Sequence, residues 1–451
     1  MTQVSDRISL DWENSILPEA PTAPDNLQQA GLTLTFLSDL LLKALYTRGA
    51  MLGLDLARFV CLPFKVVEEA LKFLKDEKCI EISGGDLIGR VSYRFTLTEL
   101  GRKRGGEAMK KCAYVGPAPV PLEDYVEQTY RQAVTGIDCN PELLRAAFAH
   151  LVIPEALFNA VGPAIVSGKS IFIYGPPGNG KTAMSRAIGD FMNNAGGEIY
   201  VPYAFMAEEA IVTLYDEAVH HAVELDGNER VKDNEAIIRE LLSFGTVDPR
   251  WVRIRRPVLV TGGELNLEML DLRYSEIANF YQAPLHVKAN GGIFLIDDFG
   301  RQLCSPKELL NRWILPLEDR HDFLTVATGK KFEVPFEQLI IFSTNLDPAD
   351  LVDDAFLRRI RHKVGINPPV IEVYEKIFKG VAKKLGMNHC PEAVEFLYER
   401  YYNTGQRNPR ASDCRDLLEI VQSICRFRRQ PVQLTRDLME EAAASFIAEF
   451  S

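Results

Sequence analysis

The sequence predicts an α/β core with parallel strands, preceded by a small α+β domain and followed by an all-helical region. Two observations predict the core. A glycine-rich turn at residues 175–180 joins an apolar run to a helical pattern, and a second apolar run ends in Asp297 and Asp298. Short apolar runs that alternate with helical patterns are typical of parallel sheets. Four amphipathic segments without strand signals then fill residues 367–451.

Length and composition indicate a folded protein of several domains. The 451 residues suffice for two to four domains, and 47% hydrophobic with 25% charged residues exclude a disordered or fibrous chain. The net charge of −11 means that any binding to nucleic acid must be local. No apolar run reaches membrane-spanning length and no signal peptide is visible, so we expect a cytoplasmic protein that does not contact membranes. The scattered cysteines predict reduced thiols and no structural metal site.

The first 113 residues divide into a tail and a compact domain. Residues 1–30 lack apolar periodicity, which predicts an extended tail or a strap across another domain. Residues 31–113 show three helical patterns and then two alternating runs, IEIS and VSYRFTLT, around Gly84, Gly85 and Gly89. This order is that of a winged helix, and the ending FTLTELGRKRG resembles the wing and the following helix of many bacterial winged-helix regulators.

The charge of this domain leaves two kinds of partner open. It contains eight Lys and six Arg against four Asp and six Glu, a local excess of +4 that fits DNA binding. However, Glu68 and Glu69 on the predicted recognition helix would repel phosphates, and winged helices also serve as protein docking modules. DNA is therefore one possible ligand of residues 31–113 and a protein is the other.

A proline- and glycine-rich segment at residues 114–139 predicts a stiff extended linker, because Pro117, Pro119 and Pro121 follow Gly116 within a few residues. An Asn-Pro-Glu sequence at residues 140–142 then predicts the start of a helix, with an N-cap, a first-turn proline and a first-turn acid. We therefore begin the α/β domain at residue 140 and extend it to residue 366.

The turn after the apolar run at residues 171–174 matches the pattern GxxxxGK[ST] between a strand and a helix. Its glycines allow backbone amides to converge on phosphate oxygens at a helix N-terminus. Lys181 would reach the β- and γ-phosphates, and the Thr182 hydroxyl would ligate Mg²⁺. The predicted loop for binding a nucleoside triphosphate, ATP, consists of Gly175, Pro176, Pro177, Gly178, Asn179, Gly180, Lys181 and Thr182.

A second anchor for magnesium comes from GGIFLIDDFG, in which four apolar residues deliver Asp297 and Asp298 to the carboxyl end of a strand. Asp297 should hold Mg²⁺ through water, and Asp298 should activate the attacking water. Two further strands complete the parallel sheet: QLIIFSTN at residues 338–345, which ends in Asn345, and HKVGI at residues 362–366.

These motifs resemble those of the AAA+ ATPases, from about residue 141 to the C-terminus, and the sequences STN and DDAFLRRI add to the resemblance. The resemblance implies a P-loop NTPase core that hydrolyses ATP. It implies that Asn345 positions the water and that Arg358 or Arg359 reaches the γ-phosphate bound by a neighbouring subunit. An arginine supplied between subunits in turn implies a homo-oligomeric ring, which we expect to be a hexamer.

The four segments in residues 367–451 match the small helical lid of that family. Arg410 stands where the family has its second sensor, with Arg407 as the alternative, and the sequence PRA at a helix start is similar to the MoxR-type branch. One departure concerns Asp298, because the family usually has glutamate there. A carboxylate one methylene shorter predicts slow hydrolysis or a compensating backbone.

The other departure is an insertion at residues 203–290, since 115 positions separate Thr182 from Asp297. It would face a substrate or partner, or serve subunit packing. The segment DFLTVATGKKFEVPFEQ predicts a hairpin with its turn at residues 328–331. This hairpin resembles the pre-sensor insert of magnesium chelatases, MoxR-type chaperones and enhancer-binding activators. Its tip residues Lys330 and Lys331 would engage an anionic polymer or acidic peptide in a pore, or would only solvate a turn.

The sequence therefore leads to one main hypothesis and two alternatives. The main hypothesis is a ring-forming ATPase that converts Mg-ATP turnover into remodelling of a protein client. The first alternative is a DNA-bound, ATP-dependent transcriptional regulator. The second is a slow, ATP-switched scaffold, which Asp298 favours.

Overall fold

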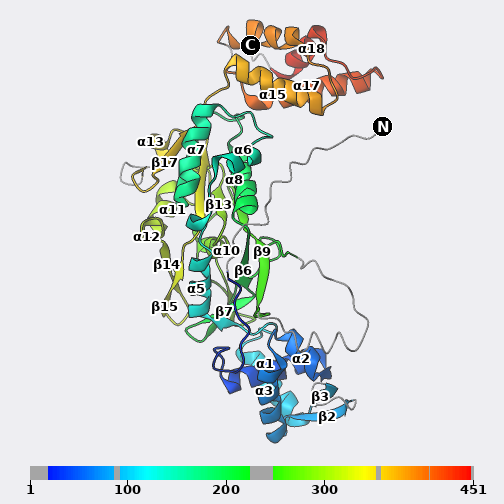
Figure 1. Ribbon diagram of the computed structural model, residues 1–451, viewed down its shortest axis with the longest axis vertical. Coiled ribbons are helices and arrows are strands. Elements are labelled where there is room, and N and C mark those ends of the chain that lie inside the picture. Colours follow the sequence, from blue (N-terminus) through cyan, green and yellow to red (C-terminus); the bar gives the residue numbers. More distant parts are fainter. Residues whose placement is uncertain (1–18, 86–91, 224–246, 352–356, 406, 448–451) are drawn as a thin grey trace.

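The computed structural model describes residues 19–85, 92–223, 247–351, 357–405 and 407–447. An N-terminal region, a central α/β region and a C-terminal helical region follow one another along the longest axis of the molecule (Figure 1). No helix among the described residues is both long enough and apolar enough to cross a membrane.

The N-terminal region has the helices and the hairpin that the sequence predicts. A small antiparallel sheet, ordered β1-β3-β2, lies beside helices whose buried leucines and valines form one core. Thr33 caps the first helix and Thr98 caps the last, because each side chain accepts a backbone N–H of the first turn. Gly89 of the expected turn lies outside the described residues. The elements are α1 (Leu34–Arg48), β1 (Met51–Leu52), α2 (Gly53–Phe59), α3 (Phe64–Asp76), β2 (Ile80–Gly85), β3 (Tyr93–Leu97) and α4 (Glu99–Lys111).

A buried ion pair fastens this region to the centre of the molecule. The Arg250 guanidinium, which is 2% exposed, pairs with Asp248 at 2.7 Å. Its Nη1 atom also donates to the carbonyls of Ala30 at 2.7 Å and Pro119 at 3.2 Å. These two residues lie just before and just after the N-terminal region. The described part of the predicted tail begins at Glu19. Its first residues lie across the central region as a strap, with Thr22 bridged to Val247, whereas Leu27 and Ala30 pack in the N-terminal core.

The prediction of an extended linker over residues 114–139 is wrong in its second half. Strand β4 (Val120–Pro121) is short and pairs in parallel with β7 (Ala204–Ala207). It is followed directly by helix α5 (Leu122–Arg131). The last proline, Pro121, is the N-cap residue of this helix. The prolines therefore precede the helix and do not interrupt it. Tyr125 of α5 is buried and stacks on Phe205 at 4.8 Å.

Five parallel strands form the central sheet in the order β10-β13-β16-β5-β17. Alternate side chains of these strands enter two separate cores, as expected for a sheet covered on both faces. One core contains side chains of α6, α7 and α8, and the other contains those of α11 and α12. The strands are β5 (Ser170–Tyr174), β10 (Val258–Thr261), β13 (Ile293–Ile296), β16 (Leu339–Thr344) and β17 (His362–Gly365). The helices are α6 (Pro141–Ala147), α7 (Glu155–Ser167), α8 (Lys181–Ala195), α11 (Pro306–Arg312) and α12 (Ile314–Asp319).

The insertion predicted at residues 203–290 is wrong as one continuous block, because β10 of the central sheet lies inside it. This edge strand has only four residues, which makes its apolar run short and easy to miss. Residues on both sides of β10 build a second sheet, ordered β11-β12-β8-β7-β4. The strands of this sheet include β8 (Ala210–Thr213), β11 (Arg273–Ser275) and β12 (Phe280–Gln282). A separate two-stranded sheet consists of β6 (Glu198–Pro202) and β9 (Trp251–Arg255).

The hairpin before the last central strands is confirmed. Strands β14 (His321–Thr325) and β15 (Lys331–Pro335) pair antiparallel, with a turn closed by the N–H of Val326 donating to the carbonyl of Lys330 at 3.0 Å. The turn therefore spans residues 326–330 and overlaps the predicted one at residues 328–331. At its tip the Lys330 ammonium pairs with Glu208 of the β7–β8 turn at 3.0 Å.

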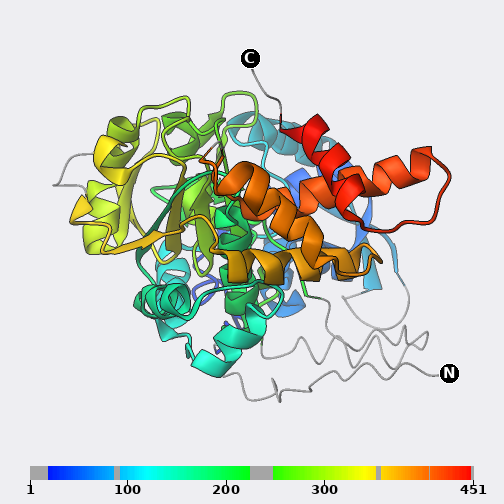
Figure 2. The ribbon, with the colours of Figure 1, turned by 90° about the horizontal axis from the view of Figure 1, so that it is seen from above.

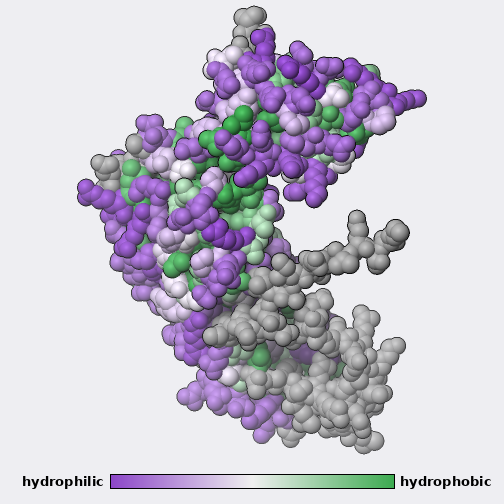
Figure 3. All heavy atoms as spheres, turned by 45° about the horizontal axis from the view of Figure 1, so that its top comes forward, coloured by the Kyte–Doolittle hydropathy of each residue, from purple (hydrophilic) through white to green (hydrophobic). Residues whose placement is uncertain are grey.

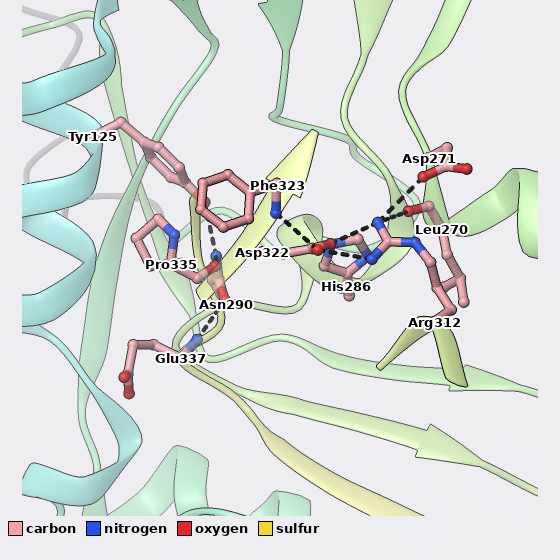
Figure 4. Close-up of polar contacts among 10 residues, drawn as sticks. All are labelled: Tyr125, Leu270, Asp271, His286, Asn290, Arg312, Asp322, Phe323, Pro335 and Glu337. Carbon is pink, nitrogen blue, oxygen red and sulfur yellow. Dashed lines mark hydrogen bonds and ion pairs between the residues drawn. The ribbon is translucent and has the colours of Figure 1, made fainter. Parts of the chain in front are cut away.

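Buried polar contacts fix both strands of this hairpin at their base (Figure 4). Asp322 on β14 accepts two hydrogen bonds from Arg312, at 2.7 and 2.8 Å, and lies 2.9 Å from Nε2 of the buried His286 in α10 (Leu285–Lys288). On the other strand, the Asn290 side chain donates to the carbonyl of Pro335 at 2.9 Å and accepts the N–H of Glu337 at 2.8 Å. The hairpin is thus held as part of the central region.

The predicted C-terminal helices are present (Figure 2). Their buried side chains form a separate core. A buried chain of polar groups orders them: the hydroxyls of Tyr374 and Tyr402 lie 3.1 Å apart, and the Tyr402 hydroxyl donates to Asp413 at 3.0 Å. Burial, together with the neighbouring Asp413 carboxylate, raises the pKa of Tyr402 far above its ordinary value. The helices are α15 (Ile371–Lys384), α16 (Pro391–Leu397), α17 (Ala411–Phe427) and α18 (Arg436–Phe446).

Candidate functional site

The glycine-rich loop connects β5 to α8 and needs its glycines for two physical reasons. Gly175, Gly178 and Gly180 have φ values of 137°, 83° and 87°, which residues with a Cβ rarely adopt. In addition, a Cβ on Gly175 would lie 2.2 Å from the carbonyl oxygen of Ile366. The loop can therefore follow this path only with glycine at these positions.

The Lys181 side chain folds back over the loop. Its Nζ atom donates to the carbonyls of Gly175 at 2.8 Å and Pro176 at 3.1 Å, and to Oδ1 of Asn345 at 2.7 Å. Lys181 is 7% exposed, and this burial lowers its pKa, while the nearby carboxylates of Asp297 and Asp298 act in the opposite direction. The ammonium group therefore sits between the loop and the carboxyl ends of the central strands.

The predicted acids lie beside the loop because neighbouring parallel strands end at the same edge of the sheet. The Thr182 hydroxyl donates to Oδ2 of Asp297 at 2.9 Å, and Nδ2 of Asn345 donates to Oδ1 of Asp298 at 2.8 Å. Asp298 is exposed and has a φ of 48°, so it turns sharply out of β13. The structure thus brings together five of the residues predicted from the sequence.

Two of these side chains fit a magnesium ion. Thr182 and Asp297 offer hard oxygen atoms, and Mg²⁺ is usually held by one or two protein ligands together with phosphate and water oxygens. The part of the chain that the structure describes has no group of three or more His, Cys, Asp or Glu side chains that could hold a metal. A cation at Thr182 and Asp297 would therefore depend on a bound phosphate to complete its ligands.

The two candidate arginine fingers differ in their surroundings. Arg359 forms an ion pair with Glu318 at 2.7 Å, at the end of α12. Arg358 is exposed, and no partner for its guanidinium is found among the described residues. Residues 352–356, which belong to the motif that precedes these arginines, lie outside the described part. Of the pair, Arg358 is the one whose guanidinium is available to another molecule.

The two candidate second-sensor arginines also separate. Arg407 is paired with Asp413 at 2.7 Å, and this carboxylate is 1% exposed, so Arg407 serves the core of the helical region. Arg410 is the N-cap residue of α17 and lies against Gly178 of the loop. It lines a hollow of about 380 Å³ with Pro176 and Pro368, and Arg407 lines the same hollow. The structure therefore brings Arg410 to the loop, but on a different side from Lys181 and Asp297.

A cleft of about 1000 Å³ lies between the central and C-terminal regions and contains the loop, Asp297, Asp298 and Asn345. Hydrophobic side chains gather where these regions meet (Figure 3). The apolar part of the cleft is lined by Val152, Ile153, Leu157, Ile366, Val373 and Ile377. An apolar cleft with few polar groups at one end is the usual form of a small-molecule site.

Sequence reasoning missed several polar residues of this cleft, which are His150, Lys363, Asn367, Lys376, Lys384, Ser412 and Arg415. Lys376 and Lys384 could have been found from their spacing. Two residues eight positions apart on a helix lie on one face, which here also carries Val373, Ile377 and Val381. Ser412 follows Arg410 by two positions. Only the contact between α17 and the loop shows that Ser412 lines the cleft.

Comparison with known proteins gives short or distant similarities. Residues 371–445 match a family described as a domain of unknown function, DUF8689. The chain is 35% identical over 83 residues to the vesicular-fusion protein SEC18 of Saccharomyces cerevisiae, which is 17% of this chain and 11% of that protein. It is 33% identical over 92 residues to the vesicle-fusing ATPase of Dictyostelium discoideum, which is 19% of this chain and 12% of that protein. The chain therefore spans only about a tenth of the length of these curated relatives.

Solved structures show a looser likeness. RuvB of Thermotoga maritima, a Holliday junction branch migration motor, is 14% identical, with 64% of this chain and 67% of that chain covered and a TM-score of 0.35. NtrX of Brucella abortus is 16% identical, with 66% and 56% covered and a TM-score of 0.38. Similarities at this level assign no activity, so the functional assignment rests on the geometry of the site.

Proposed function

We propose that this chain is an ATPase of the AAA+ type that forms a ring and uses Mg-ATP hydrolysis to remodel a protein client. One observation carries the proposal. The loop residues Lys181 and Thr182 are hydrogen-bonded directly to Asn345 and Asp297, at the carboxyl ends of neighbouring parallel strands. A lysine, a hydroxyl, carboxylates and an amide around a glycine-rich loop are the groups that phosphoryl transfer requires.

Each residue has a defined part in the proposed reaction. The loop amides and Lys181 hold the phosphates, and Thr182 with Asp297 would hold Mg²⁺, which neutralises phosphate charge when bound. Asp298 accepts a proton from the attacking water, and Asn345 orients that water. The water oxygen forms a bond to the γ-phosphorus while the bond from that phosphorus to the bridging oxygen breaks, which releases ADP and phosphate.

A shared site favours a ring. Arg358 is exposed and available, and an arginine that reaches the phosphate of an adjacent subunit is useful only in an oligomer. We propose a homo-oligomer, with a hexamer as its simplest form. Arginine fingers stabilise the charge of the transition state and contribute roughly 10³–10⁵ in rate.

A protein client is the favoured substrate for two reasons. The chain shares segments with two relatives whose names describe vesicle fusion and do not mention nucleic acid. In addition, the tip of the β14–β15 hairpin is not a free basic surface, because Lys330 is already paired with Glu208. Lys331 remains exposed beside it.

Binding of DNA by residues 31–113 is the second candidate function. It is favoured by the order of three helices and a hairpin over these residues, which is that of a winged helix, with Lys65, Lys72 and Lys75 on α3. Fluorescence anisotropy of a labelled duplex across a salt series tests it, since phosphate contacts give a steep dependence on salt. A flat titration at low salt excludes this candidate.

Steady-state ATP hydrolysis by the wild-type chain and by the Lys181→Ala variant tests the main proposal. We expect hydrolysis that depends on Lys181. If both proteins bind ATP and hydrolyse it equally slowly, the third candidate, an ATP-switched scaffold, replaces the remodelling ATPase. The scaffold candidate is supported by the short carboxylate of Asp298, which accepts a hydrogen bond from Asn345.

A further inference from the structure

The first turn of α17 lies directly on the glycine-rich loop. The backbone N–H of Ser412 donates to the carbonyl of Gly178 at 2.8 Å, and the backbone N–H of Ala411 donates to Oδ1 of Asn179 at 3.2 Å. These contacts join residues more than 230 positions apart in the sequence. The C-terminal helical region is thus hydrogen-bonded to the loop that, under the proposed function, holds the phosphates.

The Ser412 hydroxyl is placed differently from its backbone. No hydrogen-bond partner of this hydroxyl is found within the described residues. A Cβ on Gly178 would lie 2.6 Å from the Ser412 Oγ atom, so the hydroxyl rests against the bare Cα of the loop. Ser412 also lines the cleft that contains Lys181 and Thr182. A hydroxyl without a partner is therefore presented at the surface of the loop, inside the cleft.

We propose that Ser412 is a phosphate-binding residue, whose Oγ–H donates to a phosphate oxygen of the nucleotide held by the loop. This inference rests on the proposed nucleotide binding and adds a residue from the C-terminal region to it. A neutral hydroxyl is a donor to an anion at any pH in the physiological range, and hydrogen bonds to charged groups are stronger than those between neutral groups. Bound nucleotide would then bridge the loop and the first turn of α17.

The contact also explains why glycine is needed at position 178. The left-handed φ of Gly178 is one reason, and the close approach of Ser412 is a second, independent one. With any larger residue at position 178, α17 would be pushed away from the loop. The geometry thus reserves the space between Gly178 and Ser412 for a close contact between the two regions.

The test measures binding of Mg-ATP and Mg-ADP to the full chain by calorimetry, for wild type, Ser412→Ala and Ser412→Cys. The cysteine variant keeps the size of the side chain but replaces a strong donor with a weak one. We expect both variants to bind ATP about tenfold more weakly, with an unchanged unfolding midpoint. The matched control is Ser423→Ala on the same helix, whose hydroxyl donates only to the Glu419 carbonyl at 2.8 Å.

The possible outcomes separate this inference from the proposed function. If wild type binds Mg-ATP and both Ser412 variants bind it within twofold of wild type, Ser412 is not a phosphate-binding residue, and the proposed ATPase is unaffected. If Ser412→Ala loses affinity together with a lowered unfolding midpoint while Ser412→Cys binds like wild type, the residue serves packing and the inference fails. If wild type binds no nucleotide, the proposed function itself fails.

Discussion

The ammonium group of Lys181 lies 2.7 Å from the amide oxygen of Asn345, and the amide nitrogen of the same side chain lies 2.8 Å from a carboxylate oxygen of Asp298. One asparagine therefore joins the glycine-rich loop to the acid proposed to activate water. Under the proposed function, phosphates that enter the loop would compete with Asn345 for Lys181. Such competition would release the asparagine amide to orient water only when a nucleotide is bound.

Replacement of Lys181 by alanine should abolish tight binding of Mg-ATP and lower ATP hydrolysis by about 100-fold or more, because the loop loses its cation for the phosphates. Steady-state ATPase assays and nucleotide titration measure both effects. Lys379→Ala is the control, since Lys379 is an exposed lysine of α15 that does not line the cleft. Equal activity of Lys181→Ala and wild type would contradict the proposed role of the loop.

Replacement of Asp298 by asparagine should leave ATP binding within a few-fold of wild type and lower kcat by about 100-fold, because the proton acceptor is lost while the phosphate contacts remain. The Asp298→Glu variant extends the carboxylate by one methylene. If the short side chain limits the rate, this variant should hydrolyse ATP faster than wild type. Single-turnover kinetics separate the chemical step from binding, and a kcat unaffected by Asp298→Asn would remove this residue from the reaction.

Replacement of Arg358 by alanine should lower ATP hydrolysis by about 10³-fold without loss of ATP binding, whereas Arg359→Ala should have a smaller effect because Arg359 is paired with Glu318. Mixing tests whether the residue acts between subunits. Rings assembled from Asp298→Asn and Arg358→Ala subunits should regain activity at the interfaces that contain one intact residue of each kind. Mixtures no more active than either parent would count against a shared site.

Replacement of Asp322 by asparagine should destabilise the protein by about 2 kcal/mol at neutral pH. Burial alone would raise the pKa of this carboxyl, but His286 and Arg312 outweigh burial and lower it to about 2 from 3.8. Because the pKa is lower in the folded state, the stabilisation is complete above about pH 4 and is lost as the pH falls towards 2. Urea unfolding measured from pH 7 to pH 2 should therefore show the two proteins converging in acid.

The control for this prediction is Asp319→Asn, at an exposed position three residues away. It should change the free energy of unfolding by less than about 0.5 kcal/mol, as surface substitutions usually do. A constant difference between wild type and Asp322→Asn over the whole pH range would show that the carboxylate charge does not account for the stability.

The sequence predicted those parts of the molecule that local patterns specify. Short runs of apolar residues indicated β5, β13, β16 and β17. The rule that ligands lie at the carboxyl ends of parallel strands indicated Asp297 and Asp298, and the resemblance to AAA+ ATPases indicated Asn345. The hairpin at β14–β15 followed from its alternating residues. In each of these cases the signal is contained in fewer than about ten consecutive residues.

The parts that failed depend on contacts between distant segments. Prolines near residue 120 indicated an extended linker, but α5 is stabilised by packing of Tyr125 on Phe205. Strand β10 is an edge strand of four residues, too short for a periodic signal. Likewise, the sequence left Arg407 open as the alternative to Arg410, and only the buried partner Asp413 shows that Arg407 is committed to the core.

The position of Arg250 has a mechanical consequence. A single guanidinium is hydrogen-bonded to the chain just before residues 31–113 and again after them, so both connections of this region are fixed to the central region. A ligand bound to α3 would therefore move together with the central sheet whenever that sheet rotates. The distance and direction of that movement would then be set by folded structure alone.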